Sequence, residues 1–472
     1  MQSKKLRAIA LLLIMVGLVL TGLNVVGTSL ALPNSGVSSV SNQSASVLWE
    51  RNYGGSGDDK LYYTLPVENG YLLLGSSSSF TQGKMAGWVL RIDQNGNVLW
   101  NITFLEGIGT EFRYAVGLAV GFLLIGNVFL SSGAVNGLIA KMDTQGNIVW
   151  NVTVGGEKVD RLFSAVATND DFLAVGFTNS FADKNGSDVW AVKINSGGSV
   201  IWSKTYGWSR DDAGEAITCT PDDCYMIAGY TNSIGGGNYD FLLLKIDSSG
   251  NMLWYRTYGG SQSNMADAIA SVPGGYIVAG NTFSFGANDS KAWILKVDLN
   301  GNLIWDKMIG GSIYDMPTSI IVSAYGGYVI GGWTTSYGAG ERDFWIFQLD
   351  GNGNLQWSRT VRQNGYTEAY SAIELGQNEY LMAGWSNAVG KGKLYDYYLI
   401  KLDVNASQTG SDAQVYESTP SLTGNFLSLI QLASFALIGA GLLISGILLA
   451  LKRQEKQKTK NGSFKATQAL PS

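Results

Sequence analysis

Short apolar runs alternate with polar turns along most of this chain, and the alternation repeats. Between Trp293 and Trp305, an apolar run is followed by the turn sequence Asp-Leu-Asn-Gly-Asn and then by a second apolar run. This pattern is typical of a β-hairpin. The closing tryptophan recurs every 50–52 residues, which indicates a repeat architecture. The seven copies are Trp49, Trp100, Trp150, Trp202, Trp254, Trp305 and Trp357.

Alignment on the tryptophans predicts four strands in each repeat. In the fifth repeat they cover residues 266–272, 275–280, 293–298 and 302–309. The second and third strands are almost continuously apolar, as expected of sheets covered on both faces. Stacking such units around an axis buries both faces, which is the β-propeller arrangement. A β-solenoid is the alternative, but its coils are shorter and its parallel strands are not joined by hairpins.

The two ends of the repeat array set the number of blades. The seventh repeat supplies three strands and then runs into a Ser/Thr/Gly-rich segment without a fourth strand. The missing strand is present near the N-terminus, around Trp49. Pairing it with the last repeat closes the ring and removes an open sheet edge. The sequence therefore predicts an all-β, seven-bladed propeller of four-stranded antiparallel blades, closed by its N-terminal strand.

Two apolar segments flank the repeats. A basic start, an apolar run and a Ser-Leu-Ala sequence ending at Ala31 are typical of a signal peptide. Residues 425–451 contain no charged side chain and are long enough for a transmembrane helix. Basic residues follow at once, so the positive-inside rule predicts a cytoplasmic C-terminus and an extracellular propeller. This topology holds whether or not the signal peptide is cleaved.

The expected organisation is therefore a signal peptide (1–31), a leader (32–46), a propeller (47–403), a stalk (404–424), a transmembrane helix (425–451) and a basic tail (452–472). The predicted location is the cell membrane, with a single span.

The composition narrows the range of possible functions. The formal charge of −5 disfavours nucleic acid as a partner. The absence of histidine excludes His-based triads and His-ligated zinc or copper sites.

The repeated hairpin Lys-x-Asp-x-x-Gly-Asn-x-x-Trp resembles the tryptophan-docking motif of the quinoprotein (PQQ-like) β-propellers, as in archaeal and bacterial cell-surface repeat proteins. The resemblance implies that the Asp and Gly shape the outer turn and that the Trp locks neighbouring blades together. The third copy departs from the motif, with Asn195 in the Asp position. Quinoprotein cofactor chemistry does not carry over, because the chain has no adjacent Cys pair and no recognisable calcium-carboxylate set. We expect no cofactor and no metal.

An acid recurs in the linker between consecutive blades, six residues past the aromatic position of Tyr-Gly-Gly. A ring of such acids around the channel mouth would bind a cation or a basic partner. The alternative is that each carboxylate bonds backbone amides of its own linker. The rim acids are Asp59, Asp160, Asp212 and Asp315.

Two other residue types predict covalent modification. Cys219 and Cys224 flank a four-residue turn, where a disulfide fits the expected spacing and the oxidising exterior, with free buried thiols as the alternative. Six Asn-x-Ser/Thr sequons are candidate glycosylation sites. They are Asn42, Asn101, Asn151, Asn185, Asn288 and Asn405.

The loops between the second and third strands vary most among the repeats, so their rim is the predicted working face. Aromatic side chains there would anchor a glycan or peptide, or would cover their own blades. They are Phe80, Phe181, Phe285, Trp333, Tyr337 and Trp385.

We therefore expect a non-catalytic, membrane-anchored extracellular module for binding, adhesion or scaffolding of protein or glycan partners. The alternatives are a carbohydrate-active hydrolase or lyase that uses rim carboxylates, and a scaffold for assembling other surface proteins. A pair of acidic side chains in a deep central pocket would favour the enzyme. The oligomeric state is open.

Overall fold

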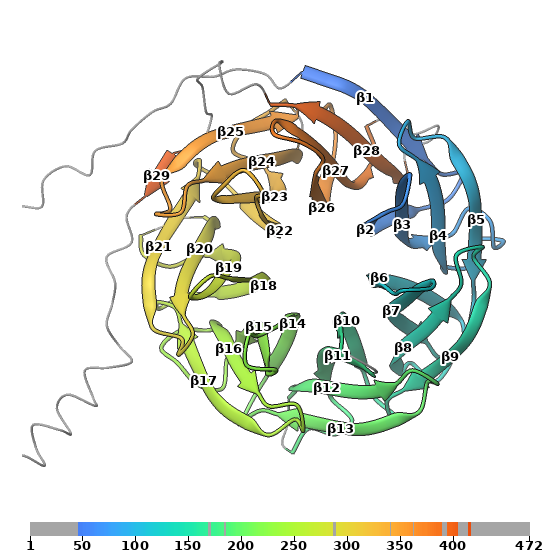
Figure 1. Cartoon of the computed structure of the whole chain (residues 1–472), viewed down its shortest axis with the longest axis horizontal. Helices are drawn as coiled ribbons and strands as arrows, with labels where there is room; N and C mark the ends of the chain where they lie inside the picture. Colours follow the sequence, from blue (N-terminus) through green and yellow to red (C-terminus); the bar gives the residue numbers. More distant parts are fainter. Residues whose placement is uncertain are drawn as a thin grey trace, which may run out of the picture. The chain divides into compact units, whose positions relative to one another are not determined.

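The computed structural model describes residues 46–168, 171–183, 186–286, 289–339, 341–361, 363–388, 394–404 and 414–416. These residues form seven antiparallel sheets, one for each repeat (Figure 1). The sheets stand around a central axis, with the first strand of each innermost and the last outermost (Figure 1). The predicted all-β, seven-bladed propeller is confirmed.

The strands follow the predicted order within every blade. Blades 1 to 3 contain β2 (Asp59–Val67), β3 (Gly70–Ser77), β4 (Ala86–Asp93) and β5 (Val98–Phe104); β6 (Gly109–Gly117), β7 (Phe122–Phe129), β8 (Val135–Met142) and β9 (Ile148–Val154); and β10 (Asp160–Ala167), β11 (Asp171–Thr178), β12 (Asp188–Asn195) and β13 (Val200–Tyr206). Blades 4 to 6 contain β14 (Asp212–Cys219), β15 (Tyr225–Thr231), β16 (Asp240–Ile246) and β17 (Met252–Tyr258); β18 (Asn264–Val272), β19 (Gly275–Thr282), β20 (Lys291–Asp298) and β21 (Leu303–Gly310); and β22 (Asp315–Val322), β23 (Tyr328–Thr334), β24 (Asp343–Leu349) and β25 (Leu355–Val361).

The seventh blade is built from both ends of the propeller. It contains β26 (Thr367–Glu374), β27 (Glu379–Ser386), β28 (Asp396–Asp403) and β1 (Ser46–Tyr53). β1 pairs antiparallel with β28, with Trp49 opposite Lys401 and Tyr53 opposite Tyr397. The closure predicted from the unpaired seventh repeat is therefore confirmed.

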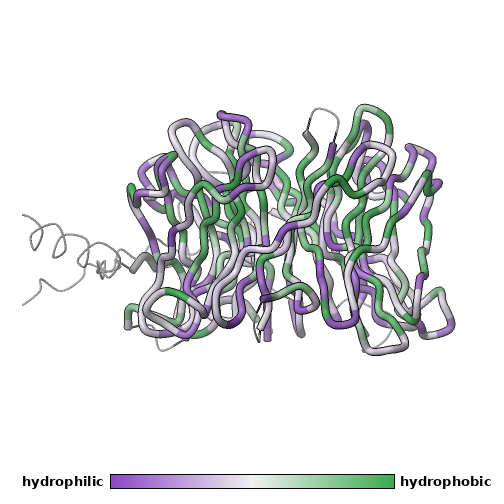
Figure 2. The backbone as a smooth tube through the Cα atoms, turned by 90° about the horizontal axis from the view of Figure 1, so that it is seen from below, coloured by the Kyte–Doolittle hydropathy of each residue, from purple (hydrophilic) through white to green (hydrophobic). Residues whose placement is uncertain are grey.

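The hydrophobic core is divided among the seven interfaces between blades. On β3, Leu73 packs into the cluster shared with blade 7, whereas Leu72 and Leu74 pack into the cluster shared with blade 2. Successive side chains of a strand point to opposite faces of its sheet, so both faces are buried. This explains why the middle strands are apolar throughout, with polar residues concentrated at the rims (Figure 2).

The repeated turn has a simple physical basis. In the fifth blade, Asp298 Oδ1 accepts hydrogen bonds from the backbone amides of Asn300 and Asn302, each at 2.8 Å. Gly301 has φ +77°, a conformation that favours glycine. The same Asp-to-amide bonds recur in other blades, so local hydrogen bonding accounts for these residue types.

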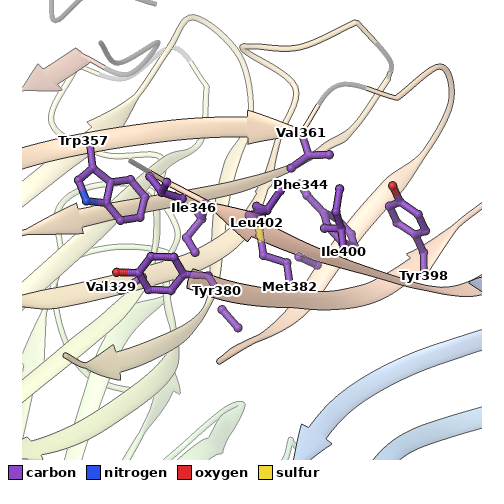
Figure 3. Packing of buried hydrophobic residues seen from close by; sticks show 13 residues of the cluster. Val329, Phe344, Ile346, Trp357, Val361, Tyr380, Met382, Tyr398, Ile400 and Leu402 are labelled. Carbon is purple, nitrogen blue, oxygen red and sulfur yellow. The ribbon is translucent and has the colours of Figure 1, made fainter. Parts of the chain in front are cut away.

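The predicted docking tryptophans lie against the turn of the next blade. A methyl group on the turn glycine would come within 3.0 Å of the tryptophan ring in each of five pairs. These pairs are Trp100 with Gly146, Trp150 with Gly198, Trp202 with Gly250, Trp254 with Gly301 and Trp305 with Gly353. Trp357 instead packs beside Tyr380, with ring centroids 5.5 Å apart (Figure 3). Trp49 packs against the cluster between blades 7 and 1.

One strand falls within the predicted stalk. The backbone of β29 (Gln414–Tyr416) pairs with β21 and adds a fifth strand to blade 5. The outermost strand of a blade offers unpaired amides and carbonyls, which explains this pairing.

The membrane predictions fall elsewhere in the chain. The predicted signal peptide, the predicted transmembrane helix at 425–451 and the basic tail lie outside the described residues. In the part of the chain that the structure covers, no helix is long and apolar enough to cross a membrane.

Candidate functional site in the central channel

Each innermost strand carries one extra residue at the same point. The register between the first and second strands of a blade shifts once, as between Leu61 and Tyr63 on β2 or between Gly214 and Ala216 on β14. Such a β-bulge re-aims the extra side chain. Because the innermost strands face the axis, all seven extra residues line the central channel.

These seven residues surround a cavity of about 540 Å³. Although they occupy equivalent places in the repeat, their side chains differ widely in chemistry, while the turn and core positions around them repeat. They are Tyr62, Arg113, Phe163, Glu215, Asp267, Thr318 and Tyr370.

One side of this ring is aromatic and cationic. The Arg113 guanidinium stands 4.2 Å from the Tyr62 ring centre and 5.6 Å from that of Phe163. Tyr62 meets Tyr370 edge to face at 5.6 Å, and Tyr370 stacks on Trp385 at 6.3 Å. Desolvation acts to lower the pKa of Arg113, but its electrostatic interactions with Glu111, Tyr62, Tyr370 and Glu215 together outweigh it, and the pKa is raised. Arg113 is therefore a permanent positive charge among aromatic rings.

The opposite side of the ring is acidic. Glu215 and Asp267 occupy the bulges of two neighbouring blades. Burial raises the pKa of Glu215 to about 7, although Arg113 and Arg161 act to lower it. Burial, together with the charge of Glu215, raises the pKa of Asp267 well above its usual value. The charge of Glu215 therefore disfavours the ionised form of Asp267.

A layer of charged side chains lies next to the ring of seven bulge residues, on the side nearer the variable loops. Arg161 pairs with Glu111 at 3.2 Å, and Arg342 pairs with Glu368. Lys60 stands 5.0 Å from the Trp385 ring centre. Both arginines of this layer are therefore neutralised by neighbouring acids.

The predicted ring of rim acids does not form an exposed site. Asp315 is fully buried and accepts hydrogen bonds from the Gly311 amide at 2.8 Å and from the hydroxyls of Thr334 and Ser336. Burial raises the pKa of Asp315 despite these bonds. Its carboxylate ties the linker to the end of β23, so a structural role accounts for it.

The other three rim acids show the same arrangement. Asp59, Asp160 and Asp212 are buried, and each accepts a linker amide and a serine hydroxyl. Asn264 holds this position in blade 5, where its side chain contacts Thr282. These contacts support the backbone-bonding interpretation over the cation-binding one.

Most of the variable-loop aromatics cover their own blades. Phe80, Phe181 and Phe285 lie 5.1, 6.1 and 5.2 Å from the tryptophan that leads the third strand of the same blade. Trp333 stands beneath Arg342 at 4.4 Å. Trp385 differs, because its ring stacks on Tyr370 and so connects the predicted working face to the channel.

The predicted disulfide is not formed, since Cys219 and Cys224 are free thiols. The strand register gives the reason. Cys219 is paired with Tyr225, and the Thr220 amide donates to the Cys224 carbonyl. Consecutive residues of a strand point to opposite faces, so the two thiols lie on different sides of the hairpin. Burial raises the pKa of both thiols.

Two of the six sequons can be placed. Asn101 and Asn151 are exposed on β5 and β9, the outermost strands of their blades. Asn42, Asn185, Asn288 and Asn405 lie outside the described residues. Glycosylation stays a prediction.

Reasoning from the sequence missed the channel ring entirely. The sequence did contain an indication of it: one position of the first strand changes in chemistry from repeat to repeat, for example from Tyr62 in the first repeat to Glu215 in the fourth. Strict alternation would have turned these side chains toward a sheet face, and only the bulge turns them to the axis. Among the described residues, no three acidic or sulfur side chains converge.

No protein-family model matches the sequence, and no curated protein matches it. The chain is similar to several solved structures. Sqt1 from Chaetomium thermophilum is 11% identical over 79% of this chain and 99% of its own, with a TM-score of 0.43. The periplasmic gluconolactonase PpgL of Pseudomonas aeruginosa is 10% identical over 77% of this chain and 100% of its own, with a TM-score of 0.39. A puromycin-hydrolyzing peptidase of Mycobacterium tuberculosis is 11% identical over 74% of this chain and 52% of its own, with a TM-score of 0.46.

Proposed function

We propose that this protein is a membrane-anchored surface module whose extracellular propeller, built from quinoprotein-like repeats, binds a small polar ligand of the glycan class in its central channel. One observation carries the proposal. Seven structurally equivalent bulge positions hold side chains of different chemistry around a cavity of about 540 Å³. A purely structural repeat has no need for such differences, whereas small-molecule sites combine apolar walls with a few convergent polar groups.

The test is ligand binding to the full-length protein with the channel open or filled. Saturation-transfer NMR with a panel of neutral, acidic and amino monosaccharides measures binding. Thr318→Phe places a ring in the channel, while Thr103→Phe adds the same ring at an exposed position of β5. We expect at least one sugar to bind to the wild type and to Thr103→Phe, and its signal to vanish in Thr318→Phe. A signal that survives in a folded Thr318→Phe variant would place binding outside the channel.

A hydrolase is the second candidate, because two carboxyl groups from neighbouring blades line the channel. Glycoside hydrolases use one protonated and one ionised carboxyl group. Asp267, with its pKa raised well above the usual value, suits the general acid. Glu215 suits the base or nucleophile, because two arginines favour its ionised form. Turnover of 4-nitrophenyl glycosides that is lost in both Glu215→Gln and Asp267→Asn would establish catalysis in place of simple binding.

A further inference from the structure

Arg113 is placed as a recognition group rather than as a structural cation. Its side chain extends from the bulge of β6 into the channel. It donates no hydrogen bond to the described residues and forms no ion pair with them. The rings of Tyr62 and Phe163 lie against the guanidinium, which leaves its N–H donors for a ligand.

The other arginines near the axis are committed elsewhere. Arg161 donates to Glu111 at 3.2 Å, and Arg342 donates to Glu368. This contrast matters because Arg161 and Arg342 use donors on protein carboxylates, whereas the half-buried Arg113 faces the channel without an acceptor among the described residues. Arg113 therefore has the donor capacity that a ligand acceptor would use.

The shape of a guanidinium indicates which acceptor fits. Its N–H groups lie in one plane and match the two oxygens of a carboxylate or phosphate in bidentate hydrogen bonds. Glu215 and Asp267 stand on the same channel level, and a doubly charged phosphate would be repelled whenever either ionises. A singly charged carboxylate suits this surrounding better.

The acidic side of the ring suits hydroxyl groups. Asp267 Oδ2 is buried and has no hydrogen-bond partner among the described residues. A carboxyl group that keeps its proton can both donate and accept a hydrogen bond, as a sugar hydroxyl can. Burial raises the pKa of both Glu215 and Asp267, which favours this neutral form over the carboxylates that an amine ligand would need.

We propose that the ligand of the channel is an acidic sugar, with its carboxylate held by Arg113 and its hydroxyl groups held by Glu215 and Asp267. The cavity of about 540 Å³ is within the range of small-ligand sites and accepts a molecule of this size. This inference rests on the proposed function, which places a small ligand in the channel, and adds the chemical class of that ligand.

The test compares three sugars of similar size that differ in charge. D-glucuronate, D-glucose and D-glucosamine are titrated into the full-length protein by calorimetry at pH 6. We expect glucuronate to bind about tenfold or more tightly than the other two, as one charge-assisted bidentate contact implies. Arg113→Gln should reduce glucuronate binding by a similar factor, so that the preference for glucuronate over glucose is lost.

Arg256→Gln is the matched control, because Arg256 lies on the outermost strand of blade 4 beside Trp254. It should bind all three sugars as the wild type does. Circular dichroism verifies that Arg113→Gln folds, and the wild-type comparison stands without that variant.

The possible outcomes distinguish failure of the acidic-sugar inference from failure of the proposed channel binding. Equal affinity for glucuronate and glucose, preference for glucosamine, or displacement of glucuronate by inorganic phosphate at equal concentration would overturn the ligand class while leaving channel binding intact. Binding of none of the sugars overturns channel binding and the ligand class together. Loss of glucuronate binding in Arg256→Gln to the same extent would also refute the role of Arg113.

Discussion

The contact between Trp254 and the turn of blade 5 gives a quantitative test of how the blades are held together. The perturbation is Gly301→Ala, which adds one methyl group. Gly301 is buried with φ +77°, and the new Cβ would lie 2.9 Å from two atoms of the Trp254 ring and 2.9 Å from Arg256 Cγ. Real Cβ atoms do not approach so closely, so the tryptophan or the turn must move.

Gly274→Ala isolates the backbone part of the effect. Gly274 has φ +79°, and a methyl group added there would have no other atom within 4 Å. Both substitutions carry the left-handed backbone penalty, about 1–2 kcal/mol. Only Gly301→Ala adds overpacking, which costs about 1–3 kcal/mol. We therefore expect Gly301→Ala to destabilise by about 2–5 kcal/mol and Gly274→Ala by about 1–2 kcal/mol.

The assay is urea-induced unfolding followed by circular dichroism, with each substitution also made in a Trp254→Ala background. Removing the indole leaves space for the methyl group, so the excess cost of Gly301→Ala should disappear there. Equal destabilisation by the two glycine substitutions in the wild-type background would refute docking of the tryptophan on this turn. An excess cost that persists without the indole would trace it to Arg256 instead.

Three other predictions concern closure, charge and the linker acids. Deleting residues 2–53 should lower the thermal midpoint far more than deleting 2–45, because it exposes the edge of β28; equal midpoints would contradict the shared blade. Folding raises the pKa of Glu215 from 4.5 to about 7, so its ionisation lowers the stability of the wild type as pH rises through that interval. In urea titrations, Glu215→Gln should be more stable than the wild type at pH 8, by up to roughly 3 kcal/mol, and no more stable at pH 4. Asp315→Ala should destabilise the protein by about 2–4 kcal/mol because the hydroxyl groups bonded to Asp315 lose their acceptor. Asp315→Asn should lose less stability, because Asn264 fills the equivalent place in blade 5. Equal losses of stability in urea titrations would refute the bonding role.

Much of the fold could be predicted because each repeat encodes its structure locally. The Asp298 carboxylate and the φ of Gly301 depend on residues within one turn, so residue types alone identified that hairpin. The seventh repeat lacks a fourth strand and the strand around Trp49 lacks a repeat of its own, so the closure of the ring followed from counting strands.

Predictions about pairs of side chains fared worse, because they depend on register. Cys219 and Cys224 are close in sequence, yet the pairing of Cys219 with Tyr225 sends the thiols to opposite faces. The rim acid Asp315 follows a linker, and only the folded chain shows that it is fully buried and accepts hydrogen bonds from Thr334 and Ser336.

The sequence by itself determined the repeat, the number of blades and the strand that closes the ring, because hydrophobic pattern and turn chemistry act over a few neighbouring residues. The tertiary structure decided the site. A one-residue bulge turns Arg113, Glu215 and Asp267 from the sheet faces to the axis, and ring closure brings these three distant residues to one cavity. Burial in that shared cavity raises the pKa values of Glu215 and Asp267, an effect that acts between blades and leaves no mark in any single repeat.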